Sequence, residues 1–176
     1  MFTATMNFAL GEEIEALRDM VHRFAQEQIA PRAAEIDATN RFPADLMPKL
    51  GELGLHGITV PEADGGAGMG YLAHVVATEE IARASASVSL SYGAHSNLCV
   101  NQINRWGTPE QKEKYLPKMA TGEIRATMAL TEPGGGSDVS AFTTTAERKG
   151  DVFVVNGGKT LISGAMKADY LLTAVR

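Results

Sequence analysis

Cysteine and histidine are scarce in this sequence of 176 residues. The single thiol, Cys99, cannot form a disulfide within the chain, so nothing points to an oxidising compartment. The four histidines, at positions 22, 56, 74 and 95, form no i, i+4 histidine pair, and there is no cluster of metal ligands near Cys99. We therefore expect no bound metal ion, because zinc and similar ions need several such ligands at close spacing.

Excess positive charge and long apolar runs are also lacking. The 16 basic and 21 acidic residues give a formal net charge of −5, whereas a nucleic-acid partner usually requires a basic stripe. No apolar run approaches the roughly 18 residues of a membrane-spanning helix. Residues 1–7 lack the basic cluster and apolar core of a leader peptide. We expect a cytoplasmic protein with neither a nucleic-acid nor a membrane partner.

Motifs of three large enzyme classes are absent as well. There is no Walker A loop for a nucleotide and no Gly-x-Ser-x-Gly elbow for a hydrolase nucleophile. The glycines at positions 66 and 68 begin a dinucleotide-binding pattern, but the position that would need the next glycine is Tyr71. We interpret this segment as a loop before a helix rather than as a nicotinamide site.

The first part of the chain carries helical periodicity. Apolar residues recur at i, i+4 and i+7 through residues 10–24, and Pro31 should end or kink the helix that they form. Phe42-Pro43 restarts a helix, and residues 108–111 have the spacing of a capping box. Residues 1–124 are thus predicted to form an all-α helical-bundle domain.

From Arg125 onward the pattern becomes that of strands. Lys149–Asp151 is expected to turn the chain, and Asn156-Gly157 is a strong hairpin signal. We predict an α+β protein in which the helical domain is followed by an incomplete antiparallel β domain over residues 125–176. Its short strands are predicted over residues 125–130, 141–146, 152–155, 159–163 and 170–175.

The run Met128–Val139 is the most informative stretch of the chain. Its glycine triplet at 134–136 lets the backbone approach a ligand closely, and Thr131 and Ser137 place hydroxyls on either side. Such a loop suits an acceptor-rich ligand, such as a flavin ring or a thioester carbonyl. The alternative is an ordinary turn between two domains, which Gly-Pro clusters mark more often.

Small residues between Ser85 and Ser91 would let another surface approach this part of the chain closely. Leu90 and Ala94 are four residues apart, so they share one helix face. The approaching surface is either a neighbouring helix or an acyl chain.

Taken together, these residues resemble the acyl-CoA dehydrogenase family, most closely its isovaleryl-CoA branch, from about Leu10 to Val175. The run Leu90–Cys99 is the feature that favours this branch. The matching runs are Phe42-Pro43 with Leu50–Gly54, Val60–Glu62 with Gly65-Gly66, Leu90–Cys99, Gln111–Pro117, Leu130–Pro133 with Gly136–Asp138, and Asn156-Gly157 with Lys159.

This resemblance implies FAD as the cofactor and α,β-dehydrogenation of a short branched acyl-CoA, isovaleryl-CoA or a near relative. In the family a glutamate removes the α-proton, the β-hydride passes to FAD, and an electron-transferring flavoprotein reoxidises the flavin. Family members form homo-oligomers, typically tetramers. No glutamate of this sequence matches the catalytic base, and the family's second helical domain is lacking. We therefore expect a truncated product that is inactive alone.

The resemblance also assigns site residues. Leu161-Ile162-Ser163 stands where the family most often has Trp-Ile-Thr, so a ring that would cover the flavin is lost and a hydroxyl is kept. The residues implied in flavin binding are Met128, Ala129, Leu130, Thr131, Gly136, Ser137, Leu161, Ile162 and Ser163, and those implied in substrate binding are Ser137, Leu90 and Ala94.

Two other functions remain open from the sequence. The helical domain could persist as a non-catalytic interaction module, in which case the loop Met128–Ser137 would bind no flavin. An acyl-CoA oxidase or nitroalkane oxidase on the same scaffold would send electrons to oxygen, although the run Leu90–Cys99 disfavours it.

Overall fold

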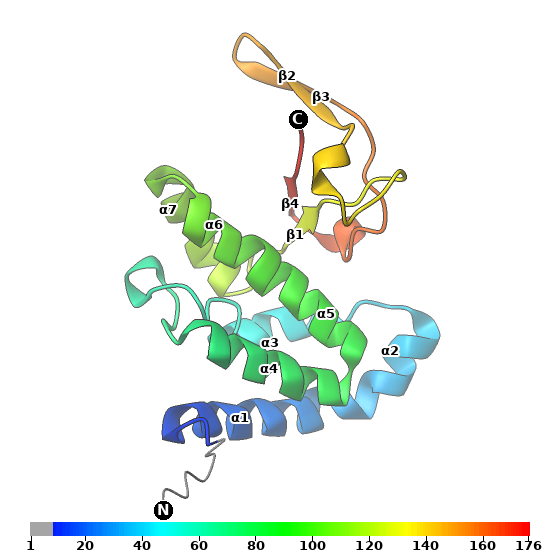
Figure 1. The fold of residues 1–176 in the computed structure, drawn as a ribbon. Helices are drawn as coiled ribbons and strands as arrows, with labels where there is room; N and C mark the ends of the chain where they lie inside the picture. The colour runs from blue at the N-terminus through cyan, green and yellow to red at the C-terminus, as the bar shows by residue number, and fades with distance from the viewer. Residues whose placement is uncertain (1–8) are drawn as a thin grey trace, which may run out of the picture.

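The computed structural model describes residues 9–176, which form a helical part and a smaller β part (Figure 1). The helices lie together at one end of the molecule, and the strands extend from them toward the other end. This order of elements confirms the predicted α+β class. The prediction on residues 1–7 lies outside the described residues.

The N-terminal helical segment passes through three helical geometries. Helix α1 (Glu12–Phe24) begins with three glutamates in its first turn, which favour the positive end of the helix dipole. A π-helical turn (Ala25–Ile29) and a 3-10 turn (Ala30–Arg32) precede α2 (Ala33–Thr39). Pro31 lies in the 3-10 turn, so the predicted kink is confirmed as a change of helical geometry.

Of the other helices, α7 begins at its predicted cap, whereas the helix predicted to restart at Phe42-Pro43 begins only at Leu46. The capping box at the start of α7 is confirmed, because Gln111 N–H donates to Thr108 Oγ1 at 3.3 Å and Thr108 N–H donates to Gln111 Oε1 at 2.9 Å. Pro48 is the third residue of α3, where a backbone N–H has no intrahelical acceptor. The bounds are α3 (Leu46–Glu52), α4 (Gly70–Ala84), α5 (Ala86–His95), a π-helical turn (Ser96–Val100), α6 (Asn101–Trp106) and α7 (Pro109–Ala120).

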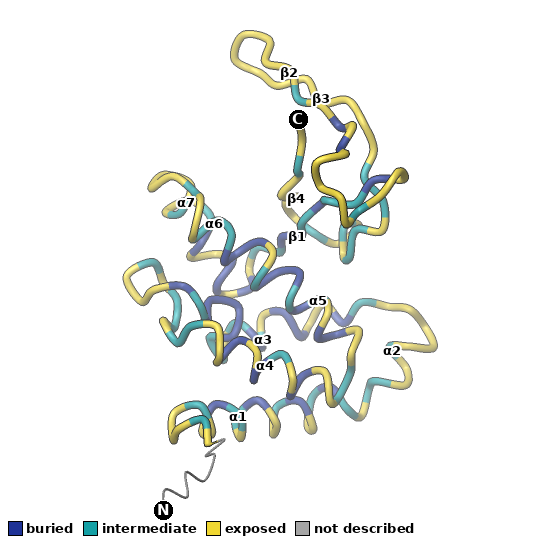
Figure 2. Tube along the Cα trace, viewed as in Figure 1, coloured by how far each residue is buried: buried dark blue, intermediate teal, exposed yellow. Residues whose placement is uncertain are grey.

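Two apolar clusters form the core. Figure 2 shows in dark blue that the buried residues lie mostly in the helical part. The larger cluster joins α1, α3, α4 and α5. The smaller contains Cys99, Leu116 and Met119 together with Ala126, so it ties the first strand to the helices. Burial raises the pKa of the Cys99 thiol to about 12, and the thiol is therefore protonated at neutral pH.

His95 joins the helical part to the first strand. Its Nδ1 accepts a hydrogen bond from Ala126 N–H at 3.1 Å, and its Nε2–H donates to the Met119 carbonyl at 2.9 Å. Burial lowers the pKa of His95, which favours the neutral ring that this pattern requires. The strand therefore begins at a fixed place against α5.

The strands pair in two different ways. Strand β1 (Ala126–Ala129) pairs in parallel with β4 (Tyr170–Thr173), whereas β2 (Thr145–Lys149) and β3 (Val152–Asn156) form an antiparallel hairpin. The hairpin confirms the turn predicted at Lys149–Asp151. The expectation of antiparallel pairing does not hold for β1 and β4, because about 40 residues connect them and so long a connection permits a parallel pair.

Two predicted strands are wrong or shifted. Residues 159–163 form no strand, since Leu161 adopts a left-handed backbone conformation with φ of 56°. Asn156-Gly157 makes no hairpin turn; it ends β3 where the chain passes Thr144. The strand predicted over 141–146 begins only at Thr145, because a 3-10 turn (Val139–Ala141) comes first.

Within residues 9–176, no helix combines the length and the apolar character needed to cross a bilayer. In the same part of the chain, no three His, Cys, Asp or Glu side chains are grouped to hold a metal ion. Two buried histidines contact protein oxygens instead: His56 Nε2–H donates to Met47 O at 2.8 Å, and His74 Nε2 lies 2.9 Å from Ser96 Oγ.

Candidate functional site

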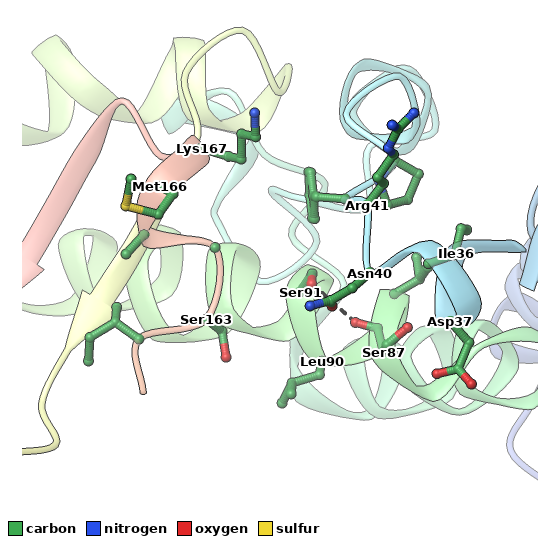
Figure 3. A pocket seen from close by; sticks show the side chains of 16 residues that line it. Ile36, Asp37, Asn40, Arg41, Ser87, Leu90, Ser91, Ser163, Met166 and Lys167 are labelled. Carbon is green, nitrogen blue, oxygen red and sulfur yellow. Dashed lines mark hydrogen bonds between the residues drawn. The ribbon is translucent and has the colours of Figure 1, made fainter. Parts of the chain in front are cut away.

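A cavity of about 760 Å³ lies where the helical and β parts meet. Figure 3 shows Leu90 and Ser91 of α5 on one wall and Ser163, from the segment after β3, on another. Ala94 and Ser163 both line a smaller neighbouring pocket of about 30 Å³. The structure therefore brings both substrate-binding candidates of α5 together with Ile162 and Ser163, although about 70 residues separate them along the chain.

The two α5 candidates differ in burial. The Leu90 side chain is exposed to 65%, whereas Ala94 is buried. Leu90 is thus free to contact a ligand, while Ala94 sets how closely anything can approach the helix. Ser87 and Ser91 line the same cavity, and the Ser91 hydroxyl donates to the Ser87 carbonyl at 3.1 Å.

The loop after β1 is closed by short hydrogen bonds. Glu132 and Gly135 exchange two backbone hydrogen bonds, each of 3.0 Å. A Cβ atom added to Gly136 would lie 2.9 Å from Thr131 Oγ1, so only glycine permits this packing. The same addition at Gly134 or Gly135 meets no atom within 4 Å. The glycine triplet therefore packs on Thr131 at one end and leaves open space at the other.

Three hydroxyls predicted to bind ligands have no partner within the described residues. Thr131, Ser137 and Ser163 make no side-chain hydrogen bond in residues 9–176, whereas the hydroxyls of Ser89 and Thr127 each donate to a carbonyl. A hydroxyl without a protein partner is available to a ligand. These three therefore fit a ligand that is rich in hydrogen-bonding groups.

The segment Leu161–Ser163 is held in an unusual conformation. Thr127 Oγ1–H donates to the Ser163 carbonyl at 2.6 Å, which fixes the segment against β1. Leu161 has φ of 56°, which side-chain-bearing residues rarely adopt, and its side chain is 87% exposed. Of the described residues other than glycine, only Asn40 shares such a positive φ.

The other candidates on β1 offer less to a ligand. Met128 lines a separate groove with Tyr170 and Leu172. Ala129 is buried and its carbonyl accepts from Ala174 N–H at 3.1 Å. The Leu130 carbonyl accepts from Lys159 Nζ at 2.9 Å. The free groups near the end of β1 are therefore the Thr131 hydroxyl and the backbone of the glycine turn.

The structure adds a charged pair to which the sequence analysis gave no role. Glu132 is buried and Lys159 half-buried; Glu132 Oε1 and Lys159 Nζ lie 2.8 Å apart, next to the flavin-binding candidates in the chain. Hydrogen bonds from Lys159, Thr144 and Thr143 hold the pKa of Glu132 well below its usual range. A glutamate within a run of apolar residues and glycines is the signal that could have indicated this pair.

Two protein-family models match the chain in sequence. The model of the acyl-CoA dehydrogenase N-terminal domain matches residues 11–123, and the model of the middle domain matches residues 127–176. The chain belongs to the acyl-CoA dehydrogenase family. Members of this family are flavoproteins that generally use FAD.

Curated members of the acyl-CoA dehydrogenase family support the assignment. The mitochondrial isovaleryl-CoA dehydrogenase of Oryza sativa subsp. japonica is 47% identical over 174 residues, which are 98% of this chain and 42% of that protein. The Pongo abelii protein of the same name is 50% identical over 165 residues, or 93% of this chain and 39% of the relative. This chain thus spans about two fifths of these relatives. The cytoplasmic location stays a prediction.

Solved structures show the same fold. The complex of glutaryl-CoA dehydrogenase with glutaryl-CoA has a TM-score of 0.91 at 40% identity, over 96% of this chain and 43% of that one. A chain solved in work on the electron transferring flavoprotein of Acidaminococcus fermentans gives 0.88 at 38% identity, over 94% of this chain and 44% of that one.

Proposed function

We propose that this chain forms the part of an FAD-dependent acyl-CoA dehydrogenase that contacts the flavin and the acyl group. The observation that carries the proposal is the set of unpartnered hydroxyls on Thr131, Ser137 and Ser163. Ser163 lines the same cavity as Leu90, and the hydrogen bond from Thr160 N–H to the Thr131 carbonyl joins the loop of Thr131 to the segment of Ser163. Because the family consists of flavoproteins, we propose a flavin as the ligand of these hydroxyls. A flavin ring presents carbonyl oxygens and ring nitrogens as hydrogen-bond acceptors.

The residues present fit such a ligand. Thr131 and Ser163 supply hydroxyls from two neighbouring segments, joined by the hydrogen bond from Thr160 N–H to Thr131 O at 2.9 Å. The open glycine turn admits a flat ring close to the backbone. A flavin held by these residues would supply the acceptor for the hydride that leaves the β-carbon of the acyl group. The exposed Leu161 side chain would cover a bound flavin ring less fully than an aromatic side chain at this position.

We further propose a short branched acyl-CoA as the substrate, of the isovaleryl-CoA kind. Leu90 and Ala94 present an apolar surface with one small residue, which leaves room for a methyl branch beside α5. Ser137 lies in the same loop as Thr131, where a hydroxyl could donate to the thioester arm. The names of the similar curated proteins support this substrate class.

The base that removes the α-proton is proposed to come from the portion of the relatives that this chain does not match. Asp37 is the one acidic side chain among those that line the large cavity, and it stands at the α2 wall rather than beside Ser163. We accordingly propose that these 176 residues alone bind ligands and turn over no substrate. Transfer of electrons to an electron-transferring flavoprotein and assembly into tetramers are proposals for the longer protein.

The test is to mix the purified chain with FAD, separate free flavin by gel filtration, and record the visible absorption spectrum. We expect a flavin band that elutes with the protein, and no reduction of an electron acceptor when isovaleryl-CoA is added. A folded chain that elutes without flavin would favour the non-catalytic interaction module. Acyl-CoA-dependent reduction of the acceptor by the chain alone would contradict the proposed origin of the base.

A further inference from the structure

A buried ion pair lies directly beside the segments proposed to contact the flavin. Glu132 Oε1 is 2.8 Å from Lys159 Nζ, and the two side chains are only 5% and 9% exposed. Charged side chains are seldom so buried, because desolvation disfavours the charged form unless every group finds a partner. The hydrogen-bond partners of Glu132 and Lys159 therefore identify the chain segments that the ion pair joins.

Glu132 uses both carboxylate oxygens. Oε1 also accepts from Thr144 N–H at 3.0 Å, and Oε2 accepts from the N–H and the hydroxyl of Thr143, each at 2.7 Å. Lys159 Nζ donates to the Leu130 carbonyl at 2.9 Å and lies 3.8 Å from the centre of the Phe142 ring. The pair thus joins three segments: the end of β1, residues 142–144, and the chain after β3.

The flavin-binding candidates are direct neighbours of this ion pair along the chain. Thr131 precedes Glu132, and Thr160 follows Lys159, with Thr160 N–H donating to the Thr131 carbonyl at 2.9 Å. Leu161–Ser163 comes next along the chain. The ion pair therefore fixes where the hydroxyl of Thr131 stands relative to that of Ser163.

We propose that Glu132 and Lys159 are positioning residues that hold Thr131 and Ser163 in the arrangement the flavin requires. The inference rests on the proposed function, since it assigns a purpose to the same site. We assign neither residue a contact with the reacting atoms, because the charged groups of both side chains bind protein partners. Their effect on the flavin passes through the backbone of Thr131 and Thr160.

Lys159→Met tests this role, because it removes the charge and keeps much of the apolar stem. We expect the Kd for FAD to rise at least about tenfold, since a buried carboxylate loses its charged partner. Lys159→Arg keeps a charge that can pair with Glu132 and should restore most of the affinity. Lys149→Met is the matched control: Lys149 pairs with Glu147 at 3.4 Å on the exposed hairpin, and its loss should leave the Kd unchanged.

A second measurement reports the positioning itself without flavin. Amide hydrogen exchange at Thr143 and Thr160 should be at least about tenfold faster in Lys159→Met, while amides of α4 stay protected as in the wild type. Where Lys159→Met does not fold, Glu132→Gln keeps the shape of the side chain, and the same two amides should exchange faster in it.

The outcomes separate the two proposals. If the wild-type protein does not bind flavin, the proposed function is wrong. Amide hydrogen exchange alone then tests whether the ion pair fixes the two segments. A flavin-binding wild type together with an unchanged Kd and unchanged exchange in Lys159→Met would overturn the inference. Equal losses of affinity in Lys159→Met and Lys149→Met would also overturn it.

Discussion

Among single residues, Ser163 offers the simplest test of the proposed function through its hydroxyl. Its carbonyl is held by Thr127, while its hydroxyl makes no hydrogen bond within the described residues. Removal of this hydroxyl therefore breaks no hydrogen bond within the fold. The hydroxyl is available to hydrogen-bond a ligand. This distinguishes it from several hydroxyls of the helical part, such as those of Thr78, Ser91 and Ser96, which donate to carbonyls four residues earlier in the chain.

Ser163→Ala should weaken FAD binding and leave stability unchanged. One lost hydrogen bond of about 1 kcal/mol corresponds to a rise of about fivefold in Kd. The Kd is measured by titration of FAD fluorescence, and the melting temperature by circular dichroism. Thr121→Ala, after α7, is the control: its hydroxyl donates to the Lys118 carbonyl and it does not line the cavity, so the Kd should be unaltered. A melting temperature that falls while the Kd stays constant would show that the hydroxyl serves the fold.

Leu161 gives a prediction about backbone strain. Because its side chain is exposed and its φ is 56°, Leu161→Gly should raise the free energy of unfolding by about 1 kcal/mol, the approximate cost of a left-handed conformation at an L-residue. Urea denaturation measures the change. Asn40→Gly is the comparison, with φ of 50°, and should gain less because asparagine tolerates this region better. Destabilisation by Leu161→Gly would mean that the exposed side chain makes contacts that matter.

At the scale of elements, Gly157 shows why one predicted strand failed to form. Its φ is 148°, and an added Cβ would lie 2.6 Å from the Cα atom of Thr144. After β3 the chain therefore continues closely alongside Thr144, in the antiparallel register of β2 and β3, instead of turning back, and Lys159 reaches Glu132. A local Asn-Gly hairpin signal is thus overridden by a long-range ion pair.

Gly157→Ala should consequently destabilise the β part by about 2–3 kcal/mol, because backbone atoms must move to admit the methyl group. Gly158→Ala, at the next residue, meets no atom within 4 Å and is the matched control. Urea denaturation of both variants, followed by circular dichroism, measures the difference. Equal stabilities of the two variants would contradict the close approach to Thr144.

The elements that depend on local signals were predictable from the sequence, and those that depend on distant partners were not. The capping box at Thr108 and the turn at Gly150 each involve residues within a few positions of one another. The parallel pairing of β1 with β4 depends instead on contacts between Ala126 and Tyr170, which no periodicity reveals. In the site, the candidate residues could be taken from the family resemblance, but their unpartnered hydroxyls and the Glu132–Lys159 pair required coordinates.

At the scale of the whole molecule, buried histidines link stability to pH. Burial lowers the pKa of His56 to about 3 and also lowers the pKa values of His74 and His95. Each ring is neutral in the fold and takes up a proton more readily when unfolded. The stability they contribute is complete above about pH 6.5, the unfolded value, and is lost as the pH falls below it.

We therefore expect the free energy of unfolding to fall by about 1.4 kcal/mol per pH unit for His56 alone between pH 6.5 and about 3. Urea denaturation at about pH 7.5, 6.0 and 5.0, which spans the range in which histidine titrates, measures the slope. His56→Gln can keep the hydrogen bond to Met47 and should flatten the slope by about that amount. An identical slope in His56→Gln and the wild type would show that other groups set the acid sensitivity.

We propose that these 176 residues carry the flavin-binding half of an acyl-CoA dehydrogenase site. A titration of FAD fluorescence with the purified, folded chain tests this directly. We expect saturable quenching at one FAD per chain, weakened when Thr131→Val and Ser163→Ala are combined. Quenching that never saturates, or that is the same in the wild type and the double variant, would contradict the claim.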